Sequence, residues 1–246
     1  MAQSLPVLVL SDPHWRINVR PETYSPKLIP SLSECFHIIE QTKLSLRGWD
    51  YPHLSHRQTE KGQGSNWVAS WSNFEGRREY WRMYQSGQFL HLFSVEETTN
   101  PAWKAQLEGV AKSHLSQRYL RDLDWSNVRG FLSIRNFLYT VTEVFEFAAR
   151  LCQKNLYDTS LAITIQLNGI NGYLLTSEPL RPLWSCYTTL QDNLGNSWAL
   201  PCAELVSASA DKSLDAVVWF FERFGWMSPP VDQFRRDQAN FLQGRL

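Results

Sequence analysis

The fold of this chain depends on one stretch, which begins with Leu46-Arg47-Gly48-Trp49-Asp50-Tyr51-Pro52-His53 and ends with Tyr80-Trp81-Arg82-Met83-Tyr84-Gln85-Ser86-Gly87-Gln88-Phe89-Leu90-His91-Leu92-Phe93. Aromatic, branched and basic residues alternate along it, a pattern that is typical of strands. The pair Ser86-Gly87 predicts a hairpin between residues 80–85 and 88–95. Alternate side chains of a strand face opposite sides of a sheet, so the rings and arginines of this stretch cannot all share one surface.

Along the whole chain the pattern predicts strands followed by helices, twice. We expect strands at 6–10, 15–19, 44–49, 67–74, 161–167, 173–176, 184–190 and 197–200. Expected helices are 31–43, 101–120, 131–154, 211–224 and 231–243. The clearest is 131–154, with an apolar stripe on one side and with Glu143 and Glu146 on the side expected to be solvated.

This order of elements predicts an α+β protein in which two small mixed or antiparallel sheets share a central helical layer. Residues 1–100 are expected to form an N-terminal, strand-rich aromatic subdomain, and 101–246 a helical and strand subdomain. One continuous domain is the alternative. A chain of 246 residues is long enough for either arrangement.

Composition limits the classes of function. The 24 basic and 24 acidic residues give a net charge of zero, so nucleic-acid binding would need a local patch. The four cysteines form no C-x-x-C pair and fit reduced, mostly buried thiols. With no signal peptide and no long apolar window, we expect no membrane span and a cytoplasmic location.

Two groups of residues are weighed as metal sites. Asp12-Pro13-His14 after an apolar run is how calcineurin-like metallophosphoesterases begin, but the later motifs of that family are absent. His53-x-x-His56 follows a proline in an expected loop, where its spacing sets no geometry. Nucleotide-binding and hydrolase signatures are also absent. We therefore predict no metal and no cofactor.

The arginines and rings of the central stretch are the better candidates. Arginine planes and aromatic rings stack on exposed bases of single strands, and the same residues form protein interfaces. The alternative, that they form an aromatic core with paired arginines, is favoured for most of them. The residues predicted to bind are Arg47, Trp49, Tyr51, His53, Arg82, Tyr84 and His91.

Three strings, 47–53, 80–93 and 142–151, resemble a module found in uncharacterised bacterial proteins. Such proteins are described as AlbA-type putative DNA-binding or ATP-binding proteins, and some are linked to phage defence. The resemblance covers most of the chain and implies a function connected with nucleic acid. It supplies no catalytic residues.

These observations predict a non-catalytic binding or regulatory subunit of a prokaryotic complex that handles nucleic acid or acts in defence. A protein partner is expected, with nucleic acid bound through a local patch or through that partner. One alternative is a metal-dependent hydrolase or nuclease that uses His14, His53, His56 and His91 with Asp12 or Asp50. The other is a sensor of a small ligand or nucleotide.

Overall fold

A computed structural model describes residues 5–74, 76–102, 105, 109, 124–177 and 185–245. Its main sheet is antiparallel, in the order β2-β3-β4-β5-β1-β7-β9. The strands are β1 (His14–Pro21), β2 (Lys61–Gln63), β3 (Trp67–Phe74), β4 (Arg77–Tyr84), β5 (Phe89–Ser94), β7 (Ser160–Asn168) and β9 (Asn193–Pro201). A second sheet pairs β6 (Gly130–Ser133) with β8 (Tyr173–Thr176) in parallel. The prediction of an α+β fold with two sheets is confirmed.

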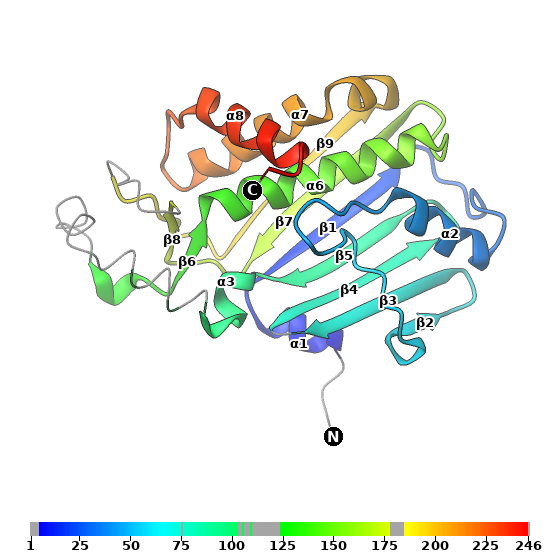
Figure 1. The fold of residues 1–246 in the computed structure, drawn as a ribbon, viewed down its shortest axis with the longest axis horizontal. Coiled ribbons are helices and arrows are strands. Elements are labelled where there is room, and N and C mark those ends of the chain that lie inside the picture. The colour runs from blue at the N-terminus through cyan, green and yellow to red at the C-terminus, as the bar shows by residue number, and fades with distance from the viewer. Residues whose placement is uncertain are drawn as a thin grey trace.

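The helices divide unequally between the two faces of the main sheet (Figure 1). One face, called the inner face, is covered by α2 (Leu32–Thr42), α6 (Ile134–Gln153) and α7 (Cys202–Arg223), and α8 (Val231–Leu242) packs on α6 and α7. The opposite face, called the outer face, contacts α1 (Leu5–Ser11), whose Val9 packs on Ala69, Tyr80 and Leu92. The short α3 (Glu96–Thr99) follows β5.

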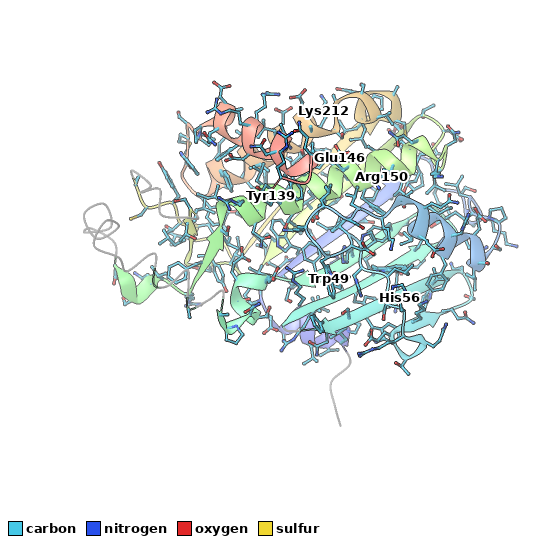
Figure 2. The ribbon with its side chains drawn as sticks, viewed as in Figure 1. Trp49, His56, Tyr139, Glu146, Arg150 and Lys212 are labelled. Atoms are coloured by element: carbon cyan, nitrogen blue, oxygen red, sulfur yellow. The ribbon has the colours of Figure 1, made fainter. Side chains whose placement is uncertain are left out.

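Helix α6 is the centre of the core. Ser133 caps its first turn by accepting a hydrogen bond from the Asn136 N–H. Most of its residues are buried on all sides, because it lies between the sheet, α7, α8 and the chain segment before β2. Tyr139 stacks on Phe241 of α8 at 4.0 Å between ring centroids. Figure 2 shows α6 crossing above the strands, with Tyr139, Glu146 and Arg150 labelled along it.

Two expected strands take another form, and a third pairs with a different strand than expected. Residues 6–10 form helix α1, since a short apolar run without alternation does not distinguish the two periods. Residues 44–49 contribute a single bridge, from Leu44 to Tyr51, that closes a loop. Residues 173–176 do form a strand, but it pairs in parallel with β6 rather than returning along β7. Much of 101–120 and the start of 184–190 lie outside the described residues.

Most other expected elements are confirmed within a few residues. The helix expected at 211–224 is α7, which begins earlier, at Cys202, and the described residues 185–190 contribute only a bridge from Thr188 to Leu174 rather than the expected strand. The hairpin at Ser86-Gly87 joins β4 to β5, and the strands at 15–19, 67–74, 161–167 and 197–200 are β1, β3, β7 and β9. Helix 31–43 is α2, and its cap is Ser31. Cys35 and Cys152 are buried, as expected of structural thiols. Strands from both predicted subdomains lie together in the main sheet.

Candidate functional site

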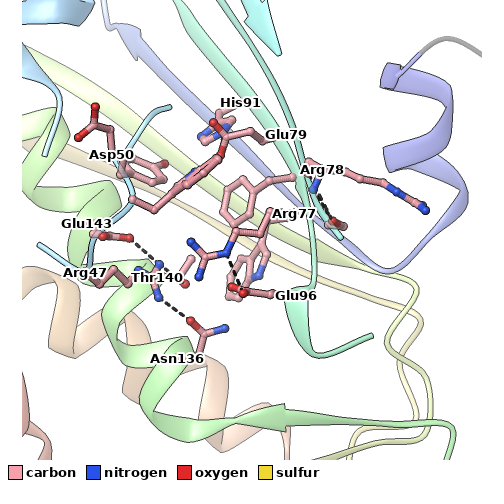
Figure 3. A pocket seen from close by; sticks show the side chains of 15 residues that line it. Arg47, Asp50, Arg77, Arg78, Glu79, His91, Glu96, Asn136, Thr140 and Glu143 are labelled. Atoms are coloured by element: carbon pink, nitrogen blue, oxygen red, sulfur yellow. Dashed lines mark hydrogen bonds and ion pairs between the residues drawn. The ribbon is translucent and has the colours of Figure 1, made fainter. Parts of the chain in front are cut away.

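A polar cavity lies between the inner face of the sheet, helix α6 and the loop from Leu44 to Tyr51 (Figure 3). Its volume is about 60 Å³. The lining combines arginines, acids and rings from segments far apart in the sequence: Trp15, Arg47, Trp49, Asp50, Tyr51, Arg77, Arg78, Glu79, His91, Phe93, Ser94, Glu96, Asn136, Thr140 and Glu143.

Arg47 anchors the loop to α6. Its Nη2 donates to Glu143 Oε2 at 2.6 Å and to Thr140 Oγ1 at 3.1 Å, and its Nη1 donates to Asn136 Oδ1. Asn136, Thr140 and Glu143 form one polar stripe along the helix, at spacings of four and three residues. Burial raises the pKa of Glu143, and the Arg47 guanidinium opposes that rise. The expected solvated position of Glu143 is therefore wrong, since this residue is 1% exposed.

A second buried acid, Glu97, extends this network. Its Oε1 accepts hydrogen bonds from the Ser133 N–H and from Asn136 Nδ2. Burial raises the pKa of Glu97 to about 7, although these hydrogen bonds act to lower it. Asn136 thus joins Glu97 to Arg47.

The loop itself is held by ion pairs and stacked rings. Lys43 Nζ lies 2.6 Å from Asp50 Oδ2, and hydrogen bonds from Lys43 and Ser45 hold the pKa of Asp50 below its ordinary value despite its partial burial. The Trp49 ring stacks on the His53 ring at 4.0 Å and on Phe74 at 5.9 Å. The ring of Trp49 therefore has a structural role, and Figure 2 shows it over the strands.

Tyr51, at the end of the loop, and His91 of β5 lie next to each other. Their rings are 5.2 Å apart, and both residues are buried. Burial, together with the Glu143 and Glu79 carboxylates, raises the pKa of Tyr51 well above its ordinary value. His91 Nε2 lies 3.8 Å from Glu79 Oε2, which is too far for a hydrogen bond. Glu79 Oε1 instead accepts the backbone N–H of His53 at 2.9 Å.

Buried hydrogen-bonding atoms without a partner concentrate here. Among the described residues they are Trp49 Nε1, the Tyr51 hydroxyl, both ring nitrogens of His91, Glu143 Oε1 and Arg78 Nε. All but that of Arg78, whose side chain extends to Asp12 on the outer face, belong to side chains of the inner cavity. Each such group costs on the order of 1–3 kcal/mol when left unpaired. The cavity is thus the place where the free protein satisfies its polar groups least.

The remaining predicted residues, Arg82 and Tyr84, lie on the other side of the sheet. Arg82 pairs across the strands with Ala69 and Leu90, on the outer face, and its guanidinium lies 4.2 Å from the centroid of the Trp67 ring. Arg82 Nε also donates to the Tyr80 hydroxyl. The predicted set is thus divided: Arg47, Trp49 and Tyr51 of the loop and His91 of β5 line the cavity, and His53 stacks beside it.

The outer face differs from the rest of the chain in charge. At described strand positions it carries Arg16, Arg20, Arg78 and Arg82 and no aspartate or glutamate. Arg16 and Arg20 are exposed and Arg82 is half-buried, whereas Arg78 is paired with Asp12. Half-buried rings lie beside them on β3 and β4: Trp67, Trp71 and Tyr84.

The residues weighed as metal ligands do not assemble into a ligand set. The described part of the chain has no group of three or more histidines, cysteines and acids that could hold a metal ion. His56 is exposed, His53 stacks on Trp49, and Asp12 pairs with Arg78. In the same part of the chain, no helix has the length and hydropathy needed to cross a membrane.

Comparisons with protein-family models, with curated proteins and with solved structures found no match. The resemblance to the bacterial AlbA-type module therefore stays a prediction.

Proposed function

We propose that this protein is a non-catalytic binding module that holds single-stranded nucleic acid on the outer face of its sheet. The observation that carries the proposal is the charge of this face. A chain with equal numbers of acids and bases places arginines, and no acids, at the described strand positions of this one surface. A polyanion is the partner that such a surface attracts.

The side chains between the arginines suit a single strand. Proteins that bind single-stranded nucleic acid stack its bases on aromatic rings and arginine planes, and their basic side chains contact its phosphates. Arg82 and Trp67 already form one such stack, at 4.2 Å, and both are half-buried, so part of each is accessible. Arg16 and Arg20 lie on β1, two strands from Arg82 in the sheet. From there they can contact the phosphates of a strand whose bases stack on Arg82 and Trp67.

The shape of the face also favours a single strand over a duplex. The major groove of DNA admits a helix or a two-stranded ribbon, and the outer face offers a broad sheet with only the short α1 on it among the described elements. The neutral charge of the whole chain supports docking within a complex rather than free capture of a polyanion. The predicted cytoplasmic location and protein partner belong to this proposal.

The test measures fluorescence anisotropy of labelled 20-mer dT and rU strands from 50 to 200 mM salt. The variant Arg16→Gln/Arg20→Gln/Arg82→Gln should bind more weakly, with a salt slope lower by roughly 0.7 for each phosphate that the variant no longer neutralises. The matched control, Arg57→Gln/Arg235→Gln/Arg236→Gln, removes the same charge elsewhere and should bind as the wild type does. Because Arg82 packs on Trp67, the double variant Arg16→Gln/Arg20→Gln serves as a second test.

Equal binding by the outer-face variants and the control would overturn the proposal. So would the absence of wild-type binding at 50 mM salt. Competition by polyglutamate as effective as by unlabelled strand would point to an acidic polypeptide as the partner instead.

A further inference from the structure

We infer that the inner cavity is a second binding site, separate from the outer face, and that it takes a small neutral ligand bearing a planar carboxamide or lactam group. Three features of the cavity carry this inference: its unpartnered buried atoms, the pairing of its charges, and its walls and size.

The unpartnered atoms define the hydrogen bonds that the ligand must make. Trp49 Nε1 can only donate and Glu143 Oε1 can only accept, whereas the Tyr51 hydroxyl and the His91 ring can do both. Their complement is a group that has an acceptor and an N–H donor close together. A carboxamide or lactam has this pair within one plane.

All charged side chains of the lining except Glu79 have a counter-charge, which disfavours a strongly charged ligand. Arg47 binds Glu143, Arg77 binds Glu96 at 2.8 Å, and Arg78 binds Asp12. Asp50 is held by Lys43, and Glu79 accepts from the backbone of His53. A phosphate would need an arginine taken from one of these pairs, and for Arg47 this would leave the buried Glu143 carboxylate unpaired. A neutral amide needs none.

Walls and size favour a flat, compact group. The rings of Trp15, Tyr51 and Phe93 form part of the lining. At roughly 10–15 Å³ for each water, a cavity of 60 Å³ corresponds to about four to six water molecules. A whole nucleotide needs more space, since ligand pockets commonly measure about 300–1,000 Å³. The unpartnered atoms have almost no accessible surface in the free protein, so ligand binding requires small movements of the Leu44–Tyr51 loop.

The test follows indole N–H signals of nitrogen-15-labelled protein during titration with uracil and with nicotinamide. We expect a saturable shift of the Trp49 indole signal, which Trp49→Phe identifies by its disappearance. Acetate and methylammonium, as charged probes of similar size, should cause none. Tyr51→Phe should lower the affinity about two- to tenfold by removing one hydrogen bond. Tyr84→Phe, the same change on the outer face, should leave the affinity unchanged.

Three results would overturn the inference. The first is no saturable shift with either amide probe, and the second is an equal shift with acetate. The third is a crystal structure, grown with the probe, in which the cavity holds ordered water only. Thermal unfolding of each variant confirms that it is folded. Strand binding at the outer face does not depend on any of these results.

Discussion

The two faces of the main sheet place the same residue types in different environments. On the inner face, Trp81 is fully buried and its Nε1 donates to the His53 carbonyl at 2.7 Å. On the outer face, Trp67 is half-buried beneath Arg82. Arginine differs likewise: Arg47 pairs with a carboxylate that is 1% exposed, whereas Arg16 and Arg20 extend into solvent. Which face a residue takes therefore decides whether it is packed in the core or accessible to solvent.

The largest effect should come from exchanging the two tryptophans for alanine. Trp81→Ala empties a fully buried site and should lower the free energy of unfolding by about 3–5 kcal/mol. Trp67→Ala removes a half-buried ring and should cost about 1 kcal/mol. Urea unfolding measures both. Equal destabilisation would show that the outer face is as well packed as the inner face.

The buried ion pair gives the next effect. Arg47→Met leaves Glu143 charged and unpaired, and should cost about 3–5 kcal/mol at pH 8. The cost should shrink toward pH 5, because protonation of Glu143 removes the buried charge. Glu143→Gln added to Arg47→Met should restore most of the stability. Arg82→Met on the outer face is the comparison, and should cost less than about 1 kcal/mol at either pH. A penalty for Arg47→Met that does not change with pH would contradict this account.

Glu97 should make stability depend on pH. Its folded pKa of about 7 exceeds the unfolded value near 4.5, so the folded protein holds the proton more tightly. Stability should therefore fall as pH rises from 4.5 to 7, by about 3 kcal/mol at 1.36 kcal/mol for each pH unit, and then level off. Glu97→Gln should remove this decline and keep the hydrogen bonds from Ser133 and Asn136. Urea unfolding of the wild type and of Glu97→Gln across this pH range tests the prediction. It would be refuted if the free energies of unfolding of the two proteins changed with pH in parallel.

The smallest effect separates satisfied from unsatisfied hydroxyls. The Tyr157 hydroxyl donates to the Gly87 carbonyl at 2.9 Å, and Tyr157→Phe should cost about 1 kcal/mol. The Tyr51 hydroxyl has no partner, so Tyr51→Phe should leave the ligand-free protein unchanged or slightly more stable. Melting temperatures measured side by side test the difference. Equal destabilisation by Tyr51→Phe and Tyr157→Phe would mean that Tyr51 has a hydrogen bond in solution.

The site could be predicted only in part. Arg47, Trp49, Tyr51, His53 and His91 were singled out from the pattern of residues 46–93, and alternation predicted only that the rings and arginines of this stretch would not all share one surface. Glu143 was missed, although Asn136, Thr140 and Glu143 form a polar stripe at helical spacing along α6. That stripe was the available signal. It was assigned to solvent because the sequence does not show that Arg47, 96 positions away, covers it.

Strong local periodicity was enough to predict the β4–β5 hairpin, helix α6, and the division of the central strands into two faces. These follow from side-chain geometry within a few residues of each position. Only the tertiary structure decided that β8 pairs with β6, that residues 5–11 form a helix on the outer face, and that a loop closes a polar cavity over α6. Such contacts join residues far apart in the chain, and their energy depends on burial and pairing that local periodicity does not specify.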